Sequence, residues 1–320
     1  MDIAQKLIDL QAKIRQDLLT APLIGLAKVL PHMTLIPGVR GQYIGGLLDA
    51  DGEFRPYKTE KGAVDGGVAI TPLEQYNYLG DVIIEFDPNK ILASIWGEAI
   101  SKKMTDLQIV TKVALKIAEK AGNHLYKQLF TAVRNANGTN TAALFNGFST
   151  LTDTLITATD VSAANGNYYD ASGTQMTISN CGDMLKKFVR EADENLTDQD
   201  LKFFVPKAVL QMYEDWYQVE YGVQAWNNIG VNQKTLVGWD NIEFVPLSNM
   251  KDQDFLFLLP QSNINILVDT QSDTENALIR QADNPKVVQF FMMAWFGVGF
   301  ETIQKEFFKV MKFTTEVVGG

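Results

Sequence analysis

The chain has 320 residues, of which 46% are hydrophobic and 21% charged, so it can bury a sizeable core and is not disordered throughout. Its formal net charge is −10, which argues against a surface devoted to nucleic-acid phosphates but leaves room for a local basic patch. The single cysteine, Cys181, excludes an intrachain disulfide, and neither a signal peptide nor an apolar run long enough to cross a membrane is present, so we expect a soluble protein made in the cytoplasm.

Residues 1–37 begin with an amphipathic pattern. Apolar side chains recur at steps of three and four through residues 2–19, which predicts a helix with one apolar face: Ile3, Leu7, Leu10, Ile14 and Leu18. Pro22 and Pro31 interrupt the pattern after it. A lone helix needs a surface to pack on, either in its own domain or on a neighbouring subunit. We interpret residues 1–37 as an N-terminal arm used in assembly.

Residues 38–75 are rich in glycine and charge and hold few large apolar side chains. Such a segment cannot bury much core by itself, and a loop of this length inside one domain is usually functional or disordered. Two short strands around an Asp51–Gly52 turn predict an extended loop in the form of a projecting hairpin. Its candidate assembly residues are Gly45, Gly46, Asp51, Lys58 and Lys61.

A long helix is predicted over residues 101–135. Its apolar positions keep steps of three and four for several turns: Leu107, Val110, Ala114, Ile117, Ala121, Leu125, Leu129 and Val133. At about 1.5 Å per residue such a helix is roughly 45–50 Å long, well above the usual length. We expect it to act as a spine, with Asn137–Gly138 marking its end.

The middle of the chain mixes short elements. The pattern predicts a helix over 178–195, a strand that ends at Pro206 and is followed by a helix, and a strand pair that turns at Asp240–Asn241. Residues 254–260 and 264–269 are compact apolar strands. Because strands and helices mix without regular strand–helix–strand alternation, the fold class is α+β.

The tail, residues 287–313, is predicted to form two long strands, with alternation continuing through Phe300, Thr302 and Gln304. Its first half is hydrophobic on both faces, which indicates a core or an interface. Trp295 and Phe296 are its candidate assembly or core residues.

Catalytic and metal-binding patterns fail at identifiable positions. Only two histidines are present, His32 and His124, and HExxH, CxxC, P-loop and GxGxxG patterns are missing. Residues 49–60 resemble an EF-hand loop, but Phe54 stands where the loop needs glycine. Cys181 is interpreted as a small buried residue. We therefore expect no catalytic residue, no cofactor and no metal site.

One enzymatic alternative involves residues 214–226. Glu214 and Asp215 lie beside an aromatic cluster, and the two together would suit a carbohydrate-active enzyme: Trp216, Tyr217, Tyr221 and Trp226. Adjacent residues on a helix do not face each other, so the two carboxylates cannot both reach one substrate. We consider a core or a subunit contact the better interpretation of these aromatic residues.

The order of these features resembles the major capsid proteins of tailed phages with the Hong Kong 97-type fold. After the arm, the extended loop and the spine, residues 143–148 (ALFNGF) look like the family's exit from the spine helix. Residues 236–239 and 245–247 are similar to a strand pair of its central domain, and 287–313 to its closing strands. The resemblance covers nearly the whole chain and depends on order and spacing.

The resemblance implies a domain division and a function. Residues 76–142 and 288–320 would form a peripheral domain that contains the spine, and 143–287 an axial domain. The protein would be a non-enzymatic head protein that self-assembles into pentamers and hexamers of an icosahedral shell enclosing double-stranded DNA. It would reside in the virion of a phage or prophage after assembly in the bacterial cytoplasm.

The implied partners are further copies of the chain, a separate scaffolding protein, a portal and packaged double-stranded DNA, with no membrane. Some relatives cross-link through a lysine of the extended loop, but the asparagine and glutamate partners of Lys58 or Lys61 are not matched here, so cross-linking is not carried over. A structural alternative is the shell of an encapsulin-type nanocompartment, which shares the fold.

Overall fold

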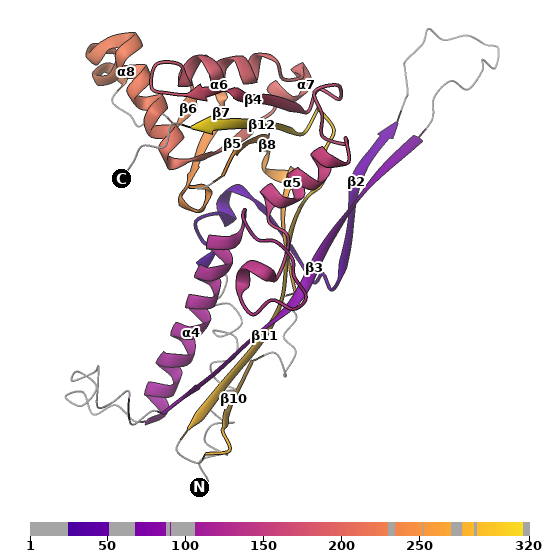
Figure 1. The fold of residues 1–320 in the computed structure, drawn as a ribbon, viewed down its shortest axis with the longest axis vertical. Helices are drawn as coiled ribbons and strands as arrows, with labels where there is room; N and C mark the ends of the chain where they lie inside the picture. The colour runs from indigo at the N-terminus through magenta and orange to yellow at the C-terminus, as the bar shows by residue number, and fades with distance from the viewer. Residues whose placement is uncertain are drawn as a thin grey trace, which may run out of the picture.

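The computed structural model describes residues 25–50, 68–87, 90, 106–229, 234–251, 253–269, 277–284 and 287–315. In these residues the strands form two six-stranded sheets with helices beside them (Figure 1), which confirms the α+β class. Beyond the helices and strands, the same residues contain four short 3₁₀ turns, at Leu30–His32, Thr141–Ala143, Ser248–Met250 and Gln261–Asn263.

The first sheet has the strand order β1-β9-β11-β3-β2, with β10 also paired to β11. Its strands are β1 (Thr34–Pro37), β2 (Gln42–Ala50), β3 (Val68–Phe86), β9 (Ile264–Val268), β10 (Ala277–Gln281) and β11 (Val288–Phe300). The second sheet has the order β4-β12-β8-β5-β7-β6. Its strands are β4 (Tyr168–Met176), β5 (Leu201–Pro206), β6 (Thr235–Leu236), β7 (Trp239–Leu247), β8 (Phe255–Pro260) and β12 (Lys309–Thr315).

Helices lie beside both sheets in Figure 1. They are α4 (Asp106–Gln128), α5 (Phe148–Thr157), α6 (Cys181–Arg190), α7 (Glu194–Thr197) and α8 (Lys207–Ile229). The helix α4 lies along the first sheet because its buried residues Val110, Ala114 and Ala118, four positions apart, pack against Phe290 and Met292 of β11. The small alanines let the helix approach the strands closely.

The predicted hairpin arm is present as an antiparallel pair. Register runs from Gln42 opposite Tyr76 to Ala50 opposite Val68, and the pair extends to the upper right of Figure 1, clear of the helices. The predicted Asp51–Gly52 turn lies outside the described residues. The strand β3 is longer than expected, because it continues to Phe86 and pairs there with β11.

The predicted spine helix differs from α4 at its end. Residues 101–105 lie outside the described part, and α4 ends at Gln128 instead of Asn135. Beyond Gln128 the backbone carbonyls of Leu129, Phe130 and Ala132 accept hydrogen bonds from residues 148, 149 and 147. The returning chain thus takes over the acceptors that a longer helix would use, while Phe130 and Phe148 pack with ring centroids 5.4 Å apart.

Several local predictions are confirmed and others are wrong. The strand ending at Pro206 with its following helix, and the apolar strands β8 and β9, are confirmed. The strand pair β6–β7 turns at Val237–Gly238 and not at Asp240–Asn241, because Gly238 supplies the positive φ of +93°. The helix predicted over 178–195 is split into α6 and α7, with Asp193 capping the start of α7 through the Asn195 N–H.

The tail also differs from its prediction. The strand β11 ends at Phe300, and Thr302 and Gln304 lie in the loop before β12. The side chain of Asn263 fixes this loop, because it binds both the N–H (2.7 Å) and the carbonyl (3.0 Å) of Thr302. The two tail strands separate, since β12 pairs with β4 and β8 of the second sheet. The domain division remains a prediction. Strand pairing crosses its bounds, because β12 lies in the predicted peripheral domain (288–320) and pairs with two strands of the predicted axial domain (143–287).

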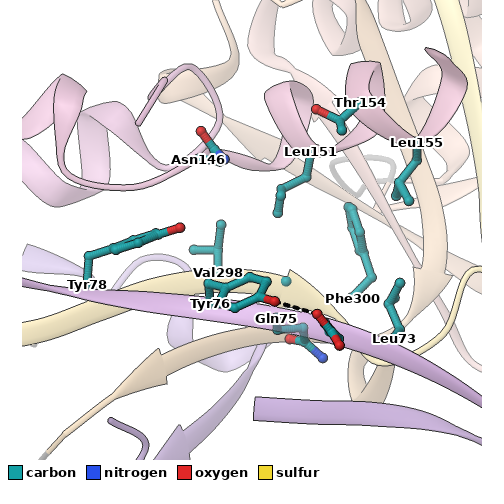
Figure 2. A pocket seen from close by; sticks show the side chains of 12 residues that line it. Leu73, Gln75, Tyr76, Tyr78, Asn146, Leu151, Thr154, Leu155, Val298 and Phe300 are labelled. Atoms are coloured by element: carbon teal, nitrogen blue, oxygen red, sulfur yellow. Dashed lines mark hydrogen bonds between the residues drawn. The ribbon is translucent and has the colours of Figure 1, made fainter. Parts of the chain in front are cut away.

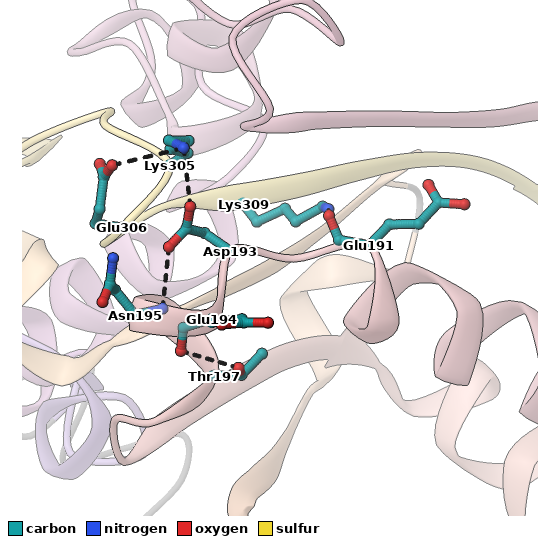
Figure 3. A network of polar contacts seen from close by, with 8 residues as sticks. All are labelled: Glu191, Asp193, Glu194, Asn195, Thr197, Lys305, Glu306 and Lys309. Carbon is teal, nitrogen blue, oxygen red and sulfur yellow. Dashed lines mark hydrogen bonds and ion pairs between the residues drawn. The ribbon is translucent and has the colours of Figure 1, made fainter.

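The buried side chain of Lys309 makes the free energy of unfolding depend on pH. The Lys309 side chain runs towards Glu191 (Figure 3) and donates to its backbone carbonyl, while Lys305 at the surface pairs with Asp193 at 2.9 Å. Burial lowers the pKa of Lys309 from 10.5 to about 8, so the folded state binds this proton less tightly than the unfolded chain does. This penalty is present below pH 8 and disappears as pH rises towards 10.5.

We therefore expect the free energy of unfolding of the wild type to rise, relative to Lys309→Met, between pH 8 and 10.5. Urea unfolding at several pH values measures this difference. Lys305→Met is the matched control: the pKa of Lys305 is raised, chiefly by its hydrogen bond with Asp193, so its contribution is lost at high pH and has the opposite sign. A pH-independent difference for Lys309→Met contradicts the prediction.

Candidate assembly surface

The base of the hairpin carries a buried polar cluster that spans four strands. Tyr43 of β2 lies opposite Gln75 of β3, and Gly299 of β11 lies opposite Asn265 of β9. Glu301 follows directly after β11, and its carboxylate accepts a 2.7 Å hydrogen bond from Asn265 Nδ2. The Tyr43 hydroxyl lies 3.3 and 3.4 Å from the two carboxylate oxygens. The cluster therefore connects β2 to the end of β11.

The electrostatics of the cluster follow from its burial. Desolvation raises the pKa of Tyr43, and the nearby charge of Glu301 raises it further, so this hydroxyl stays protonated and able to donate. Gln75 is 4% exposed, and neither its side-chain oxygen nor its nitrogen has a hydrogen-bond partner among the described residues. Buried amides without partners are costly, so the junction between hairpin and sheet is held at some cost in stability.

Glycines make this close crossing of strands possible. A Cβ on Gly46 would lie 2.5 Å from the Thr71 carbonyl oxygen, and its φ of +152° is one that other residues rarely adopt. A Cβ on Gly45 would lie 2.7 Å from Gln75 Nε2, and one on Gly299 2.2 Å from Gln75 Oε1. Two of the predicted assembly residues, Gly45 and Gly46, thus lie at the hairpin's base and shape its geometry.

A pocket of about 260 Å³ lies beside the hairpin base (Figure 2), between β3, α5 and the end of β11. Leu151 and Leu155 of α5 point towards Val298 and Phe300, and Tyr76, whose hydroxyl donates to Glu74, lies on the other side. The lining is mostly apolar and its few polar groups do not converge, so it has the character of a packing recess more than of a catalytic site.

The first sheet has an apolar face on the side opposite α4. Side chains alternate along a strand, and Val82 and Phe86 pack with α4, so Leu79 and Ile83 point the other way. Leu79 is 47% and Ile83 55% exposed, and Leu79 lies opposite Trp295. We call Leu79, Ile83, Phe291 and Trp295 the outer apolar face. Exposed aliphatic side chains grouped in this way are typical of an interaction surface.

The structure separates the two candidate tail residues. Trp295 is half-buried and contributes to the outer apolar face, whereas Phe296 is 2% exposed and packs edge-on against Phe145 at 4.8 Å. Phe296 is therefore a core residue. The remaining candidates, Asp51, Lys58 and Lys61, lie outside the described residues, as does most of the EF-hand-like segment. The part that any of these residues plays in assembly stays a prediction.

The aromatic residues of 214–226 do not form an open platform. Trp216 and Tyr217 are buried in the core of the second sheet, and a Cβ on Gly182 would lie 2.1 Å from the Trp216 ring. Tyr221 is partly exposed, and the Trp226 side chain lies outside the described part. Burial raises the pKa of Glu214, and the neighbouring Asp215 raises it further. Their tight packing favours the core interpretation of Trp216 and Tyr217 over sugar binding.

Other sites searched for in the sequence lack support in the described residues. Cys181 is buried, as predicted, and desolvation raises the pKa of its thiol to about 12. A thiol with so high a pKa is a poor nucleophile at neutral pH. Within the part of the chain that the structure describes, no group of three or more His, Cys, Asp or Glu residues is placed to hold a metal ion. No helix among these residues is long and apolar enough to cross a membrane.

Sequence reasoning missed the polar cluster altogether. Glu301, Gln75 and Asn265 are far apart in the sequence and match no motif. The one local signal is the alternation of Gly297 and Gly299 within an otherwise bulky strand, since glycine inside a strand often marks the close approach of another backbone. A Cβ on Gly297 would lie 2.4 Å from the Tyr76 carbonyl oxygen.

Comparisons with known proteins bear on the fold. No family model matches the chain, and no curated protein matches its sequence. A chain of the satellite phage P4 procapsid that includes the size determination protein is 10% identical, with a TM-score of 0.56 over 99% of this chain and 92% of that one. The capsid of a native GTA particle is 12% identical, with a TM-score of 0.57 over 90% of each chain.

The capsid of an empty GTA particle gives a similar result, with a TM-score of 0.55, 10% identity and 90% of both chains covered. At these identities the likeness shows the fold. The chain therefore has the fold of phage and GTA capsid chains across almost its whole length.

The glycines at the hairpin base predict a position-specific effect on stability. We expect Gly46→Ala to lower the free energy of unfolding by about 1–3 kcal/mol, because the new methyl group meets the Thr71 carbonyl and the backbone is strained. Gly173→Ala is the matched control, since Gly173 also lies in a strand but has no atom within 4 Å of its added Cβ. Thermal and urea unfolding measure both variants. Equal stability of the two variants contradicts the proposed crowding.

Proposed function

We propose that this chain is the major capsid protein of a tailed phage or prophage, a Hong Kong 97-type shell subunit that assembles with copies of itself. The observation that carries the proposal is the match in fold to a procapsid chain over 99% of this chain and 92% of the other. A match that covers almost the whole of both chains means that the two share one complete architecture, and not a module grafted onto another protein.

Two features of the isolated subunit support self-association. The β2–β3 pair projects from the body in Figure 1, which gives one subunit the means to reach past its neighbour. The outer apolar face leaves Leu79 and Ile83 largely exposed, and burying such side chains against a second copy releases roughly 25 cal/mol per Å² of apolar surface. Closed shells need contacts on several sides of each subunit, and the chain offers at least these two.

The proposal includes location and partners. The subunit is made in the bacterial cytoplasm and resides in the virion, where pentamers and hexamers enclose double-stranded DNA. A separate scaffolding protein and a portal take part in assembly, and the role is structural and non-enzymatic. The encapsulin-type compartment shares the expected architecture, and no feature of the described residues favours it over a phage shell.

Electron microscopy tests the proposal directly. We expect the purified full-length chain to form pentamers, hexamers or shells in negative stain, with matching large species in sedimentation velocity. A chain that stays monomeric at high concentration, also when co-expressed with the scaffolding protein, contradicts the proposed function.

A charge placed on the outer apolar face is expected to block assembly without unfolding the subunit. Ile83→Asp puts a carboxylate where we propose a contact with a second copy, and because Ile83 is 55% exposed its loss costs the subunit little stability. Ile178→Asp is the matched control at another exposed aliphatic position, next to α6. We expect only Ile83→Asp to remove shells from micrographs, with unchanged thermal unfolding. Normal shells from Ile83→Asp exclude this face as a contact.

The hairpin is expected to be needed for shells and dispensable for folding. Ala50 and Val68 are cross-strand partners, so residues 51–67 can be replaced by an Asn-Gly turn that suits a two-residue hairpin. The shortened chain should unfold cooperatively at a temperature close to that of the wild type and form no shells in negative stain. Loss of cooperative unfolding would show instead that the replaced residues belong to the core.

A further inference from the structure

The exposed side of α4 carries a row of basic side chains. Lys112, Lys116 and Lys120 follow one another at steps of four, and Lys127 continues the row with His124 between; all are exposed. With 3.6 residues per turn these positions share one side of the helix, opposite the buried Val110, Ala114 and Ala118. We call Lys112, Lys116, Lys120, His124 and Lys127 the α4 basic stripe. The fifteen residue-to-residue steps from Lys112 to Lys127 make it about 22 Å long.

The stripe stands out against the charge of the whole protein. The chain has a formal net charge of −10, yet among residues 110–128 Glu119 is the one carboxylate facing four lysines. Glu119 pairs with Lys116 at 2.8 Å, and the Lys116 side chain remains 71% exposed. Lys28 stands next to the stripe, with its Nζ 5.8 Å from the centre of the Tyr126 ring. This side of α4 is thus net positive, although the chain as a whole is net negative.

The two sides of the first sheet differ in charge. Because side chains alternate along β3, Asp81 and Glu85 lie on the side opposite α4, beside the outer apolar face, and both are exposed. Arg280 reaches the same side through Gln289, which also binds Glu85. This part of the subunit is therefore a slab with a basic helix on one side and a more acidic, apolar surface on the other.

The composition of the stripe favours a polyanion over a protein partner. None of the large apolar side chains of residues 110–128 is exposed, whereas the centre of a protein interface is normally apolar and depleted in lysine. Lysine ammonium groups on flexible stems act as point charges that suit phosphate oxygens. The stripe has no exposed aromatic side chain to stack on bases, so it offers no means of reading sequence.

We propose that the α4 basic stripe contacts the phosphate backbone of duplex DNA without sequence preference, and that the α4 side of the first sheet faces the inside of the shell. That the polyanion is DNA rests on the proposed capsid function. The inference goes beyond that function because it assigns the surface that binds DNA and the side of the sheet that faces the shell's interior. Neutralising several phosphates along about 22 Å releases counterions, which makes the affinity strongly dependent on salt.

Unassembled full-length subunits and a labelled 30-base-pair duplex of random sequence provide the test. Fluorescence anisotropy is measured between about 50 and 200 mM salt. The stripe variant is Lys116→Gln, Lys120→Gln, Lys127→Gln, and the matched control removes three exposed lysines elsewhere by Lys207→Gln, Lys234→Gln, Lys251→Gln. Both variants change the net charge equally, so an effect of total charge is the same in both.

We expect the stripe variant to lose at least about tenfold in affinity at the lowest salt, and its slope of log affinity against log salt to fall by nearly three, since each phosphate contact adds about 0.9. The control should keep most of its affinity. Equal losses in both variants, or a wild-type chain that binds no duplex, overturn the inference. So does a stripe variant that binds DNA normally but forms no shells, because the stripe then contacts protein.

Shell formation by the same variants, scored in negative stain, separates this inference from the capsid proposal. Wild-type shells together with an unchanged DNA affinity of the stripe variant contradict the inference and leave the capsid function standing. Stripe-dependent DNA binding by a chain that never forms shells contradicts the capsid function and supports the phosphate contact.

Discussion

The pairing of β11 with three other strands is the interaction on which the rest of the structure depends. Its thirteen residues pair with β3 along most of their length, with β10 at the start and with β9 at the end. Immediately afterwards the Asn263 side chain turns the chain at Thr302, and β12 enters the second sheet between β4 and β8. The loop after β11 is thus one of the connections between the two sheets, and Lys309 lies buried just beyond it.

The same strand explains why the hairpin and the helix are placed as they are. The side of β11 that carries Phe290 and Met292 packs on α4, and the other side contributes Trp295 to the outer apolar face. Near its end Gly299 makes room for the Gln75 side chain, and the Glu301 carboxylate lies close to Tyr43 of β2. The projecting hairpin, the basic helix and the outer apolar face therefore all belong to or pack on the first sheet. Their relative orientation depends on β11, which contacts β3 and α4.

Local patterns predicted much of the fold. The apolar runs of β8 and β9, the strand and helix around Pro206 and the antiparallel hairpin could be read from the sequence, because each depends on short-range periodicity or on turn residues. The glycines at the hairpin base were also found in this way. The end of α4 was not, because residues 147–149 compete for its carbonyls from outside the helix.

By itself the sequence determined the α+β class, the order of the elements and the positions of Gly45, Gly46 and the lysines of α4, since composition and spacing along the chain decide these. Only the tertiary structure decided that the two tail strands lie in different sheets, that Phe296 is core while Trp295 is partly open, and that Glu301 meets Gln75 and Asn265. Those outcomes depend on contacts between residues far apart in the sequence, and no local preference of the backbone encodes which strands will become neighbours.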